Sequence, residues 1–220
     1  MRLSFKNSLG TKQRHDNIVD MIYFIRTIRV LSMSEMIRAF LSIDIDNDSL
    51  LSQIQKVQQK LDLTAAKMKI VRRDNIHFTL RFFGDTSSSR LNEIQTCLDK
   101  IEVHPFEVEI GGIGSFPNKR RPRVIWVGIT HNESEVLSLK SKVDSALAEI
   151  GYQIEKKYTA HATIARVRFV KDPLRLAENL ESLANESLGR MNIDRIRMIK
   201  STLTPTGPVY ETLWEIGEGS

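Results

Sequence analysis

The segment IHFTLRFFG (residues 76–84) and the segment AHATIARVRF (residues 160–169) share one pattern, a histidine, any residue, a threonine and an apolar residue. Hydrophobic residues alternate along both segments, which predicts β-strands. Two such His-x-Thr pairs arise by chance with a frequency on the order of 3% in a chain of this composition, so the pattern needs support from its surroundings.

The two faces of each predicted strand differ in chemistry, because residues two apart on a strand share a face. In the first segment the predicted polar face carries Asn75, His77, Thr79 and Arg81. The predicted apolar face carries Ile76, Phe78, Leu80 and Phe82. In the second segment the polar face carries His161 and Thr163, and the other face carries Tyr158, Ala160, Ala162 and Ile164.

The elements predicted around the two segments follow the same order twice. The first half shows strand and helix patterns at residues 37–45, 46–61, 68–71, around His77, 88–101 and 106–114. The second half shows them at residues 123–130, 133–150, around His161, 172–188 and 193–203. His77 lies 40 residues after Ile37, and His161 lies 38 residues after Arg123.

We therefore predict an α+β fold with two pseudo-symmetric β-α-β-β-α-β lobes. Each lobe has an antiparallel sheet and outer helices, and the lobes form a central groove. Residues 36–220 are expected to make one bilobal domain, with lobes at about 36–115 and 122–220 and with strand exchange between them left open. Residues 1–35 do not match this pattern and are interpreted as an N-terminal extension, either disordered or containing an apolar helix.

Composition is that of an ordinary soluble globular protein, with 41% hydrophobic and 27% charged residues. The most apolar run, IVDMIYFIRTIRVL, contains Asp20, Arg26 and Arg29, which are costly in a bilayer. We therefore expect a cytoplasmic protein that is a monomer and has no contact with a membrane. Cys97 is the single cysteine, and its position in a helical pattern favours a buried structural thiol.

Net charge gives little information about partners. Of the formal charge of +5, residues 1–35 contribute six Lys/Arg minus three Asp/Glu, or +3, which leaves +2 for the rest of the chain. The part expected to fold is nearly balanced, so charge alone does not identify a nucleic-acid-binding protein.

Two histidines and two threonines that meet across a groove suit chemistry at phosphorus. One imidazole can take a proton from the attacking oxygen while the other gives a proton to the leaving oxygen. The hydroxyls of Thr79 and Thr163 can donate hydrogen bonds to phosphate oxygens. No cluster of metal ligands accompanies them, so we expect neither a metal nor another cofactor. His15, His104 and His131 are interpreted as structural.

The two motifs and their flanks resemble a known family. His77-Phe78-Thr79-Leu80 and His161-Ala162-Thr163-Ile164 are similar to the paired His-x-Thr-x motifs of the two-histidine (2H) phosphoesterases, and most similar to those of the RNA 2',3'-cyclic phosphodiesterases, also called 2'-5' RNA ligases. Further similar segments are MIRAFLSIDI, NIHFTLRFFGD, SFPNKRRPRVIWVGI and LTPTGPVYETL. Ala160 departs from the family, which usually has proline before the second histidine; proline there sets backbone geometry, so we expect activity to survive.

The resemblance implies hydrolysis of RNA 2',3'-cyclic phosphate ends to 2'-phosphomonoesters. It implies that His77 is the proton donor to the leaving oxygen and His161 the base that activates water. Phe40 is a candidate for stacking on a base, with a core position equally open, and Arg123 is a candidate for contact with RNA. The alternatives are the same chemistry on a small cyclic phosphate or a 2'-5' oligonucleotide, reverse ligation, or an RNA-binding module without turnover.

Overall fold

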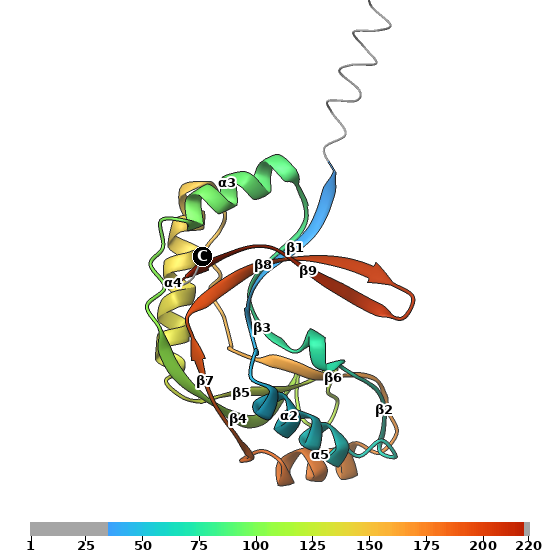
Figure 1. The fold of residues 1–220 in the computed structure, drawn as a ribbon. Helices are drawn as coiled ribbons and strands as arrows, with labels where there is room; N and C mark the ends of the chain where they lie inside the picture. The colour runs from blue at the N-terminus through green and yellow to red at the C-terminus, as the bar shows by residue number, and fades with distance from the viewer. Residues whose placement is uncertain (1–34, 218–220) are drawn as a thin grey trace, which may run out of the picture.

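The computed structural model describes residues 35–217, which form an α+β fold (Figure 1). The predicted extension at residues 1–35 lies outside the described residues except for Glu35. The first half contains β1 (Met36–Asp44), α2 (Asp48–Lys60), β2 (Ala66–Ile70), the 3-10 turn η1 (Arg73–Asn75), β3 (His77–Ser87), α3 (Ser88–Leu98) and β4 (Phe106–Phe116). The second half contains β5 (Val124–His131), α4 (Glu133–Glu149), β6 (Ala162–Val170), α5 (Pro173–Ser182), β7 (Ser187–Ile193), β8 (Arg195–Thr204) and β9 (Gly207–Gly217). No helix within the described residues is long and apolar enough to cross a membrane.

The strands form one nine-stranded sheet with the order β7-β4-β5-β6-β3-β1-β8-β9, and β2 pairs with β6. Neighbouring strands are antiparallel. The backbone pairing of β3 with β6 is a single pair, Phe78 with Ala162. This junction divides the sheet into two lobes, one built from β3, β1, β8 and β9 and the other from β2, β6, β5, β4 and β7. The predicted fold class is therefore confirmed.

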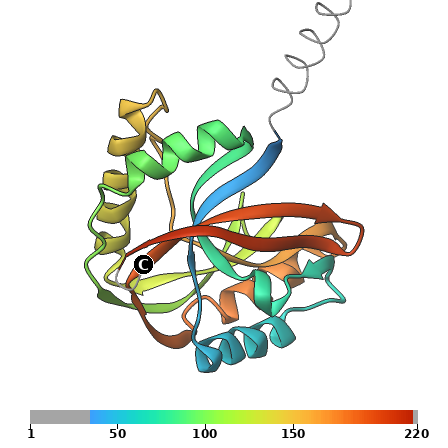
Figure 2. The same ribbon diagram turned by 45° about the horizontal axis from the view of Figure 1, so that its top comes forward.

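Each lobe contains elements from both halves of the chain. Strand β4 of the first half pairs with β5 of the second, and β8 of the second half pairs with β1 of the first. The helices follow the same rule, because α2 packs on β6 and β7 while α4 packs beside α3. Figures 1 and 2 show the two helix pairs on their separate lobes, α3 with α4 and α2 with α5.

The helices form where capping residues precede amphipathic sequence. The side chains of Asn47, Ser87 and Asp172 accept hydrogen bonds from backbone N–H groups in the first turns of α2, α3 and α5. The apolar residues that recur at helical spacing in α2, α3 and α4 are buried: Leu50, Leu51, Ile54, Val57, Leu61, Leu91, Ile94, Leu98, Val136, Leu139, Val143 and Leu147. Cys97 is buried as predicted, and burial raises the pKa of its thiol.

The predicted helix at residues 172–188 was too long. Helix α5 ends at Ser182, and β7 begins at Ser187. Strand β7 pairs with β4, so the tertiary contact overrides the helical periodicity of residues 183–188. The predicted β-α-β-β-α-β order also requires a short strand between α4 and β6, equivalent to β2, and the structure has none there.

The two halves are related by a shift of 84 residues (161 − 77), and the pairing of β1 with β3 recurs with this shift in β5 and β6. Ile43 pairs with Phe78 as Val127 pairs with Ala162. Ser42 pairs with Thr79 as Trp126 pairs with Thr163. The backbone geometry at the two motifs is therefore a true structural repeat.

A β-bulge follows the threonine of the first motif and corrects one prediction. Leu41 pairs with Arg81 while Ser42 pairs with Thr79, so Leu80 has no partner on β1. An extra residue of this kind reverses the alternation of side chains. Arg81 is consequently buried, at 8% exposure, whereas Phe82 is 48% exposed. Both had been predicted on the opposite faces.

The second motif contains the same bulge. Ile125 pairs with Ala165 while Trp126 pairs with Thr163, so Ile164 is the unpaired residue. As a result Ala165 is buried and Arg166 is exposed. Phe82 and Arg166 thus occupy equivalent positions in the two copies.

Arg81 belongs to a buried ionic network that ties β3 to α4. Its guanidinium donates to Asp144 at 3.0 Å and to the carbonyl of Gln153 at 2.8 Å. Lys140 donates to the same carboxylate at 2.6 Å and pairs with Glu155 at 2.8 Å. Asp144 and Lys140 are each about 4% exposed at the side chain, so each charge depends on its partners.

Replacing Asp144 with alanine is expected to lower the free energy of unfolding by about 3–5 kcal/mol, because two buried cations lose their shared carboxylate. Urea denaturation followed by circular dichroism measures this change. Lys142→Ala on the exposed side of the same helix is the control and should change stability by less than about 0.5 kcal/mol. Equal stability of the two variants would show that the network does not stabilise the fold.

Candidate functional site

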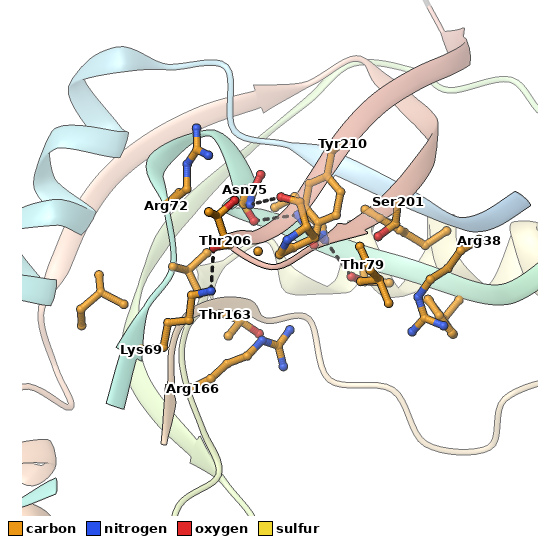
Figure 3. Close-up of a pocket in the computed structure, with 18 of the residues that line it drawn as sticks. Arg38, Lys69, Arg72, Asn75, Thr79, Thr163, Arg166, Ser201, Thr206 and Tyr210 are labelled. Atoms are coloured by element: carbon orange, nitrogen blue, oxygen red, sulfur yellow. Dashed lines mark hydrogen bonds between the residues drawn. The ribbon is translucent and has the colours of Figure 1, made fainter. Parts of the chain in front are cut away.

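A pocket of about 420 Å³ lies where the two lobes meet. All four predicted motif residues line it, namely His77, Thr79, His161 and Thr163. The remaining walls come from β1, β2 and the β8–β9 hairpin, as Figure 3 shows. The structure therefore brings the two halves of the predicted site together.

The pairing of Phe78 with Ala162 explains why the four side chains meet. Each of these residues lies between the histidine and the threonine of its motif, and both are fully buried. Side chains that flank a buried residue on a strand point to the opposite face. In an antiparallel arrangement this register places His77 toward Thr163 and Thr79 toward His161.

The two imidazoles are oriented in the same way. Nδ1 of His77 lies 3.0 Å from the carbonyl oxygen of Asn75, and Nδ1 of His161 lies 2.8 Å from that of Thr159. A carbonyl can only accept, so each Nδ1 carries the proton. Nε2 is then the atom left for chemistry in both rings. Nε2 of His77 lies 3.1 Å from the hydroxyl of Thr79.

Aromatic side chains hold His77 on one side of the pocket. The ring of Phe40 stacks on the imidazole with a centroid distance of 4.7 Å, and Tyr210 meets it edge-on at 5.3 Å. These contacts limit the rotation of the imidazole and reduce its exposure to water.

A different aromatic pair supports His161. Phe116 meets the imidazole edge-on at 5.0 Å, and Trp126 lies at 6.1 Å. The indole of Trp126 fits against β4 only because Gly114 has no side chain, since a Cβ there would lie 2.1 Å from the ring.

Burial lowers the pKa of His77 below its ordinary value of 6.5, because desolvation disfavours the imidazolium. The negative charge of Asp44, which pairs with His77 across β1 and β3, opposes this shift. The hydrogen bond to Asn75 also raises the pKa, whereas the positive charges of Arg166 and His161 lower it.

The pocket is electropositive. Its lining contains Arg38, Lys69, Arg72 and Arg166 and no carboxylate. Arg38 lies over the ring of Phe82, with 4.6 Å between the guanidinium carbon and the ring centroid. A cationic, partly apolar pocket of this kind suits an anion attached to an aromatic or sugar group.

Phe40 and Arg123, the two candidates for contact with RNA, lie in different environments. Phe40 lines the pocket but is 4% exposed, and its face is stacked on His77. Arg123 is exposed immediately before β5 and does not line the pocket; its backbone carbonyl accepts a hydrogen bond from the N–H of Val167.

Sequence reasoning did not identify Arg38, Arg166 and Tyr210 as pocket residues. Arg166 could have been found from the repeat, because it follows its histidine by five residues as Phe82 does. Recognising that both face the pocket required the bulge.

The remaining candidate residues in the described part of the chain form neither a metal site nor part of the pocket. No group of three or more His, Cys, Asp or Glu side chains within residues 35–217 is placed to hold a metal ion. His104 and His131 do not line the pocket.

Comparisons with known proteins agree with the repeat. The family model described as LigT like Phosphoesterase matches residues 43–126 and again residues 127–210. Each match has the length of the structural repeat, 84 residues.

Two curated relatives named RNA 2',3'-cyclic phosphodiesterase cover most of the chain. The protein from Methanothermobacter thermautotrophicus is 35% identical over 176 residues, which is 79% of this chain and 95% of the relative. The protein from Methanocaldococcus jannaschii is 33% identical over 81% of this chain and 99% of its own length.

Solved structures share the fold. The apo form of E. coli LigT superposes with a TM-score of 0.67 at 20% sequence identity, covering 84% of this chain and 98% of that chain. The repeated family match and the sequence identity to the curated relatives confirm the resemblance seen in the two motifs, and the solved structure shares the fold. The chain therefore belongs to the LigT-like phosphoesterase family.

Proposed function

We propose that the protein hydrolyses 2',3'-cyclic phosphates at RNA ends to 2'-phosphomonoesters without a metal ion, with His77 and His161 as acid and base. The observation that carries the proposal is the pair of imidazoles in one electropositive pocket, each with Nδ1 bound to a carbonyl, which leaves Nε2 as the nitrogen that can exchange a proton. The curated relatives named RNA 2',3'-cyclic phosphodiesterase support the choice of substrate.

The proposed step is an in-line displacement. Nε2 of His161 accepts a proton from water as the water oxygen forms a bond to phosphorus. The bond from phosphorus to the 3' oxygen breaks, and His77 donates a proton to that oxygen. The products are a 2'-phosphomonoester and a 3' hydroxyl. The hydroxyls of Thr79 and Thr163 donate to the non-bridging oxygens, where negative charge develops.

Each histidine is predicted to be essential to the rate. His77→Ala and His161→Ala should each lower kcat for a 2',3'-cyclic phosphate by about 10²–10⁴-fold, the usual loss when a general acid or base is removed. The double variant should lose far less than the product of the two single losses, because the two groups act in one step. Thr79→Ala and Thr163→Ala should cost less, since each removes one neutral hydrogen bond.

His104→Ala and His131→Ala are the matched controls and should keep nearly the whole rate. A loss of less than about threefold in a folded His77 or His161 variant would remove that residue from the mechanism. Formation of a 3'-phosphomonoester would reverse the assignment of the leaving oxygen. Tight RNA binding without turnover by the wild-type protein would favour a binding module.

The pH dependence should reveal the lowered pKa of His77. As a general acid, His77 must be protonated, so kcat/KM should fall as pH rises through its pKa, below the ordinary 6.5. Because the charge of Asp44 raises this pKa, Asp44→Asn should move the alkaline limb of kcat/KM to still lower pH. If the acid limb moves instead, His77 is the base.

Hydrolysis should continue in EDTA at an unchanged rate, because proton transfer between two imidazoles requires no metal. The assay is release of phosphomonoester from a cyclic nucleotide, with and without the chelator. Loss of the rate in EDTA and recovery with a divalent cation would contradict acid–base catalysis by the histidines alone.

A further inference from the structure

The ribbon formed by β2 and β6 has an unusual charge. The two strands, with sequences AKMKI and ATIARVRFV, contain four basic residues and no acidic residue. The basic residues are Lys67, Lys69, Arg166 and Arg168, and all four are exposed. The pairing of the strands places Lys69 directly opposite Arg166.

None of these four side chains has an ion-pair partner among residues 35–217, although eighteen contacts between Lys or Arg and Asp or Glu form elsewhere in this part of the chain. Arg197 provides the contrast, since it contacts Asp44, Asp46 and Glu215. Four unneutralised cations on adjacent strands create a local positive potential that attracts a polyanion.

An exposed aromatic side chain lies within this charge. Phe169 is 63% exposed and pairs with Lys67 across the ribbon. The register shifts here, because Val167 pairs with Met68 and Phe169 with Lys67, which leaves Arg168 as a bulged residue. A bulge of this kind allows neighbouring side chains to face solvent together, as Arg168 and Phe169 do.

The ribbon is continuous with the pocket. Lys69 and Arg166 line the pocket, and Lys67, Arg168 and Phe169 extend the same strands away from it. Figure 3 shows Lys69 and Arg166 on neighbouring strands at the pocket edge, with Lys69 bonded to the carbonyl of Thr206 in the β8–β9 hairpin at 2.9 Å. A chain that leaves the pocket past Arg166 therefore meets the exposed cations next.

We propose that the β2–β6 ribbon binds the single-stranded RNA that precedes the reacting phosphate, with Lys67 and Arg168 on backbone phosphates and Phe169 stacked on a base. Alternating cations with an exposed aromatic ring is how proteins hold single strands without reading their sequence. The inference rests on the proposed function and deepens it, because it makes an oligonucleotide, rather than a cyclic mononucleotide, the preferred substrate.

The experiment compares two substrates, a 2',3'-cyclic mononucleotide and a single-stranded oligoribonucleotide of about ten residues with the same cyclic phosphate end. The variants are Lys67→Ala/Arg168→Ala and Phe169→Ala, which lie outside the pocket. We expect each to lower kcat/KM for the oligonucleotide by about 5-fold or more and to leave the mononucleotide within about twofold. Phe169→Tyr, which keeps an aromatic ring, should retain the wild-type kcat/KM for the oligonucleotide.

Salt gives a second measure. The logarithm of kcat/KM for the oligonucleotide should fall linearly with the logarithm of salt concentration, with a slope that becomes shallower by roughly 0.7 for each phosphate contact removed. Lys142→Ala and Leu137→Ala, exposed on α4, are the matched controls for a lost cation and a lost apolar side chain. Neither control variant should change kcat/KM for either substrate.

Binding separates this inference from the proposed function. Fluorescence anisotropy with a labelled oligonucleotide ending in a 3' hydroxyl tests the ribbon without any reaction. If the protein hydrolyses cyclic phosphates but the ribbon variants treat both substrates alike, the ribbon proposal is wrong and the proposed function stands. If the protein hydrolyses no cyclic phosphate but the ribbon variants still bind the oligonucleotide more weakly than the wild type, the proposed function is wrong and the ribbon proposal stands. Stronger binding of a blunt duplex than of the single strand would also overturn the ribbon proposal.

Discussion

The site depends on one backbone pairing, Phe78 of β3 with Ala162 of β6. It is the point at which the two lobes share a sheet. The two paired residues are completely buried, so their neighbours on either side must face the pocket. Because the strands are antiparallel, one pairing is sufficient to bring two histidines and two threonines onto one face in a two-fold arrangement. A slip of one strand by one residue would turn the histidine and the threonine of that strand toward the core, so burial of Phe78 and Ala162 strongly disfavours that register.

The bulge that follows each threonine determines what surrounds the four polar groups. On a regular strand Arg81 would continue the polar row and face the pocket. The extra residue instead directs Arg81 into the ionic network with Asp144 and presents Phe82 to the pocket. In the second copy the same bulge presents Arg166. The backbone is thus duplicated while the walls differ, with an aromatic ring beyond one threonine and a guanidinium beyond the other.

Sequence patterns predict those parts of this structure that depend on local periodicity. The buried faces of the helices follow from a period of 3.6 residues, and the grouping of His77 with Thr79 follows from the period of two residues along a strand. The prediction of a helix over residues 172–188 is wrong after Ser182, because the pairing of β7 with β4 determines the conformation there. A contact between segments so distant in the sequence leaves no local signal. The exchange of β4 and β8 between lobes has the same origin. Arg38 and Tyr210 line the pocket from β1 and β9, and only the assembled sheet brings them into one pocket with His77.

A duplicated site raises a chemical problem, because two identical imidazoles in identical backbone positions would have identical proton affinities, yet acid–base catalysis requires unlike roles. The surroundings remove the equivalence. Asp44 pairs with His77 across β1 and β3, and the residue related to Asp44 by the repeat is Gly128, which has no charge. Phe40 stacks on His77, and the residue related to Phe40 is Val124. His77 is therefore desolvated by aromatic rings and at the same time supported by one carboxylate. A bound phosphate adds a negative charge beside this imidazole, and because burial weakens screening, that charge favours the imidazolium more than it would at the surface. In the proposed mechanism the anion would thus promote protonation of His77, the residue proposed as the acid, and the unlike surroundings of the two imidazoles would supply the difference that the repeat alone does not provide.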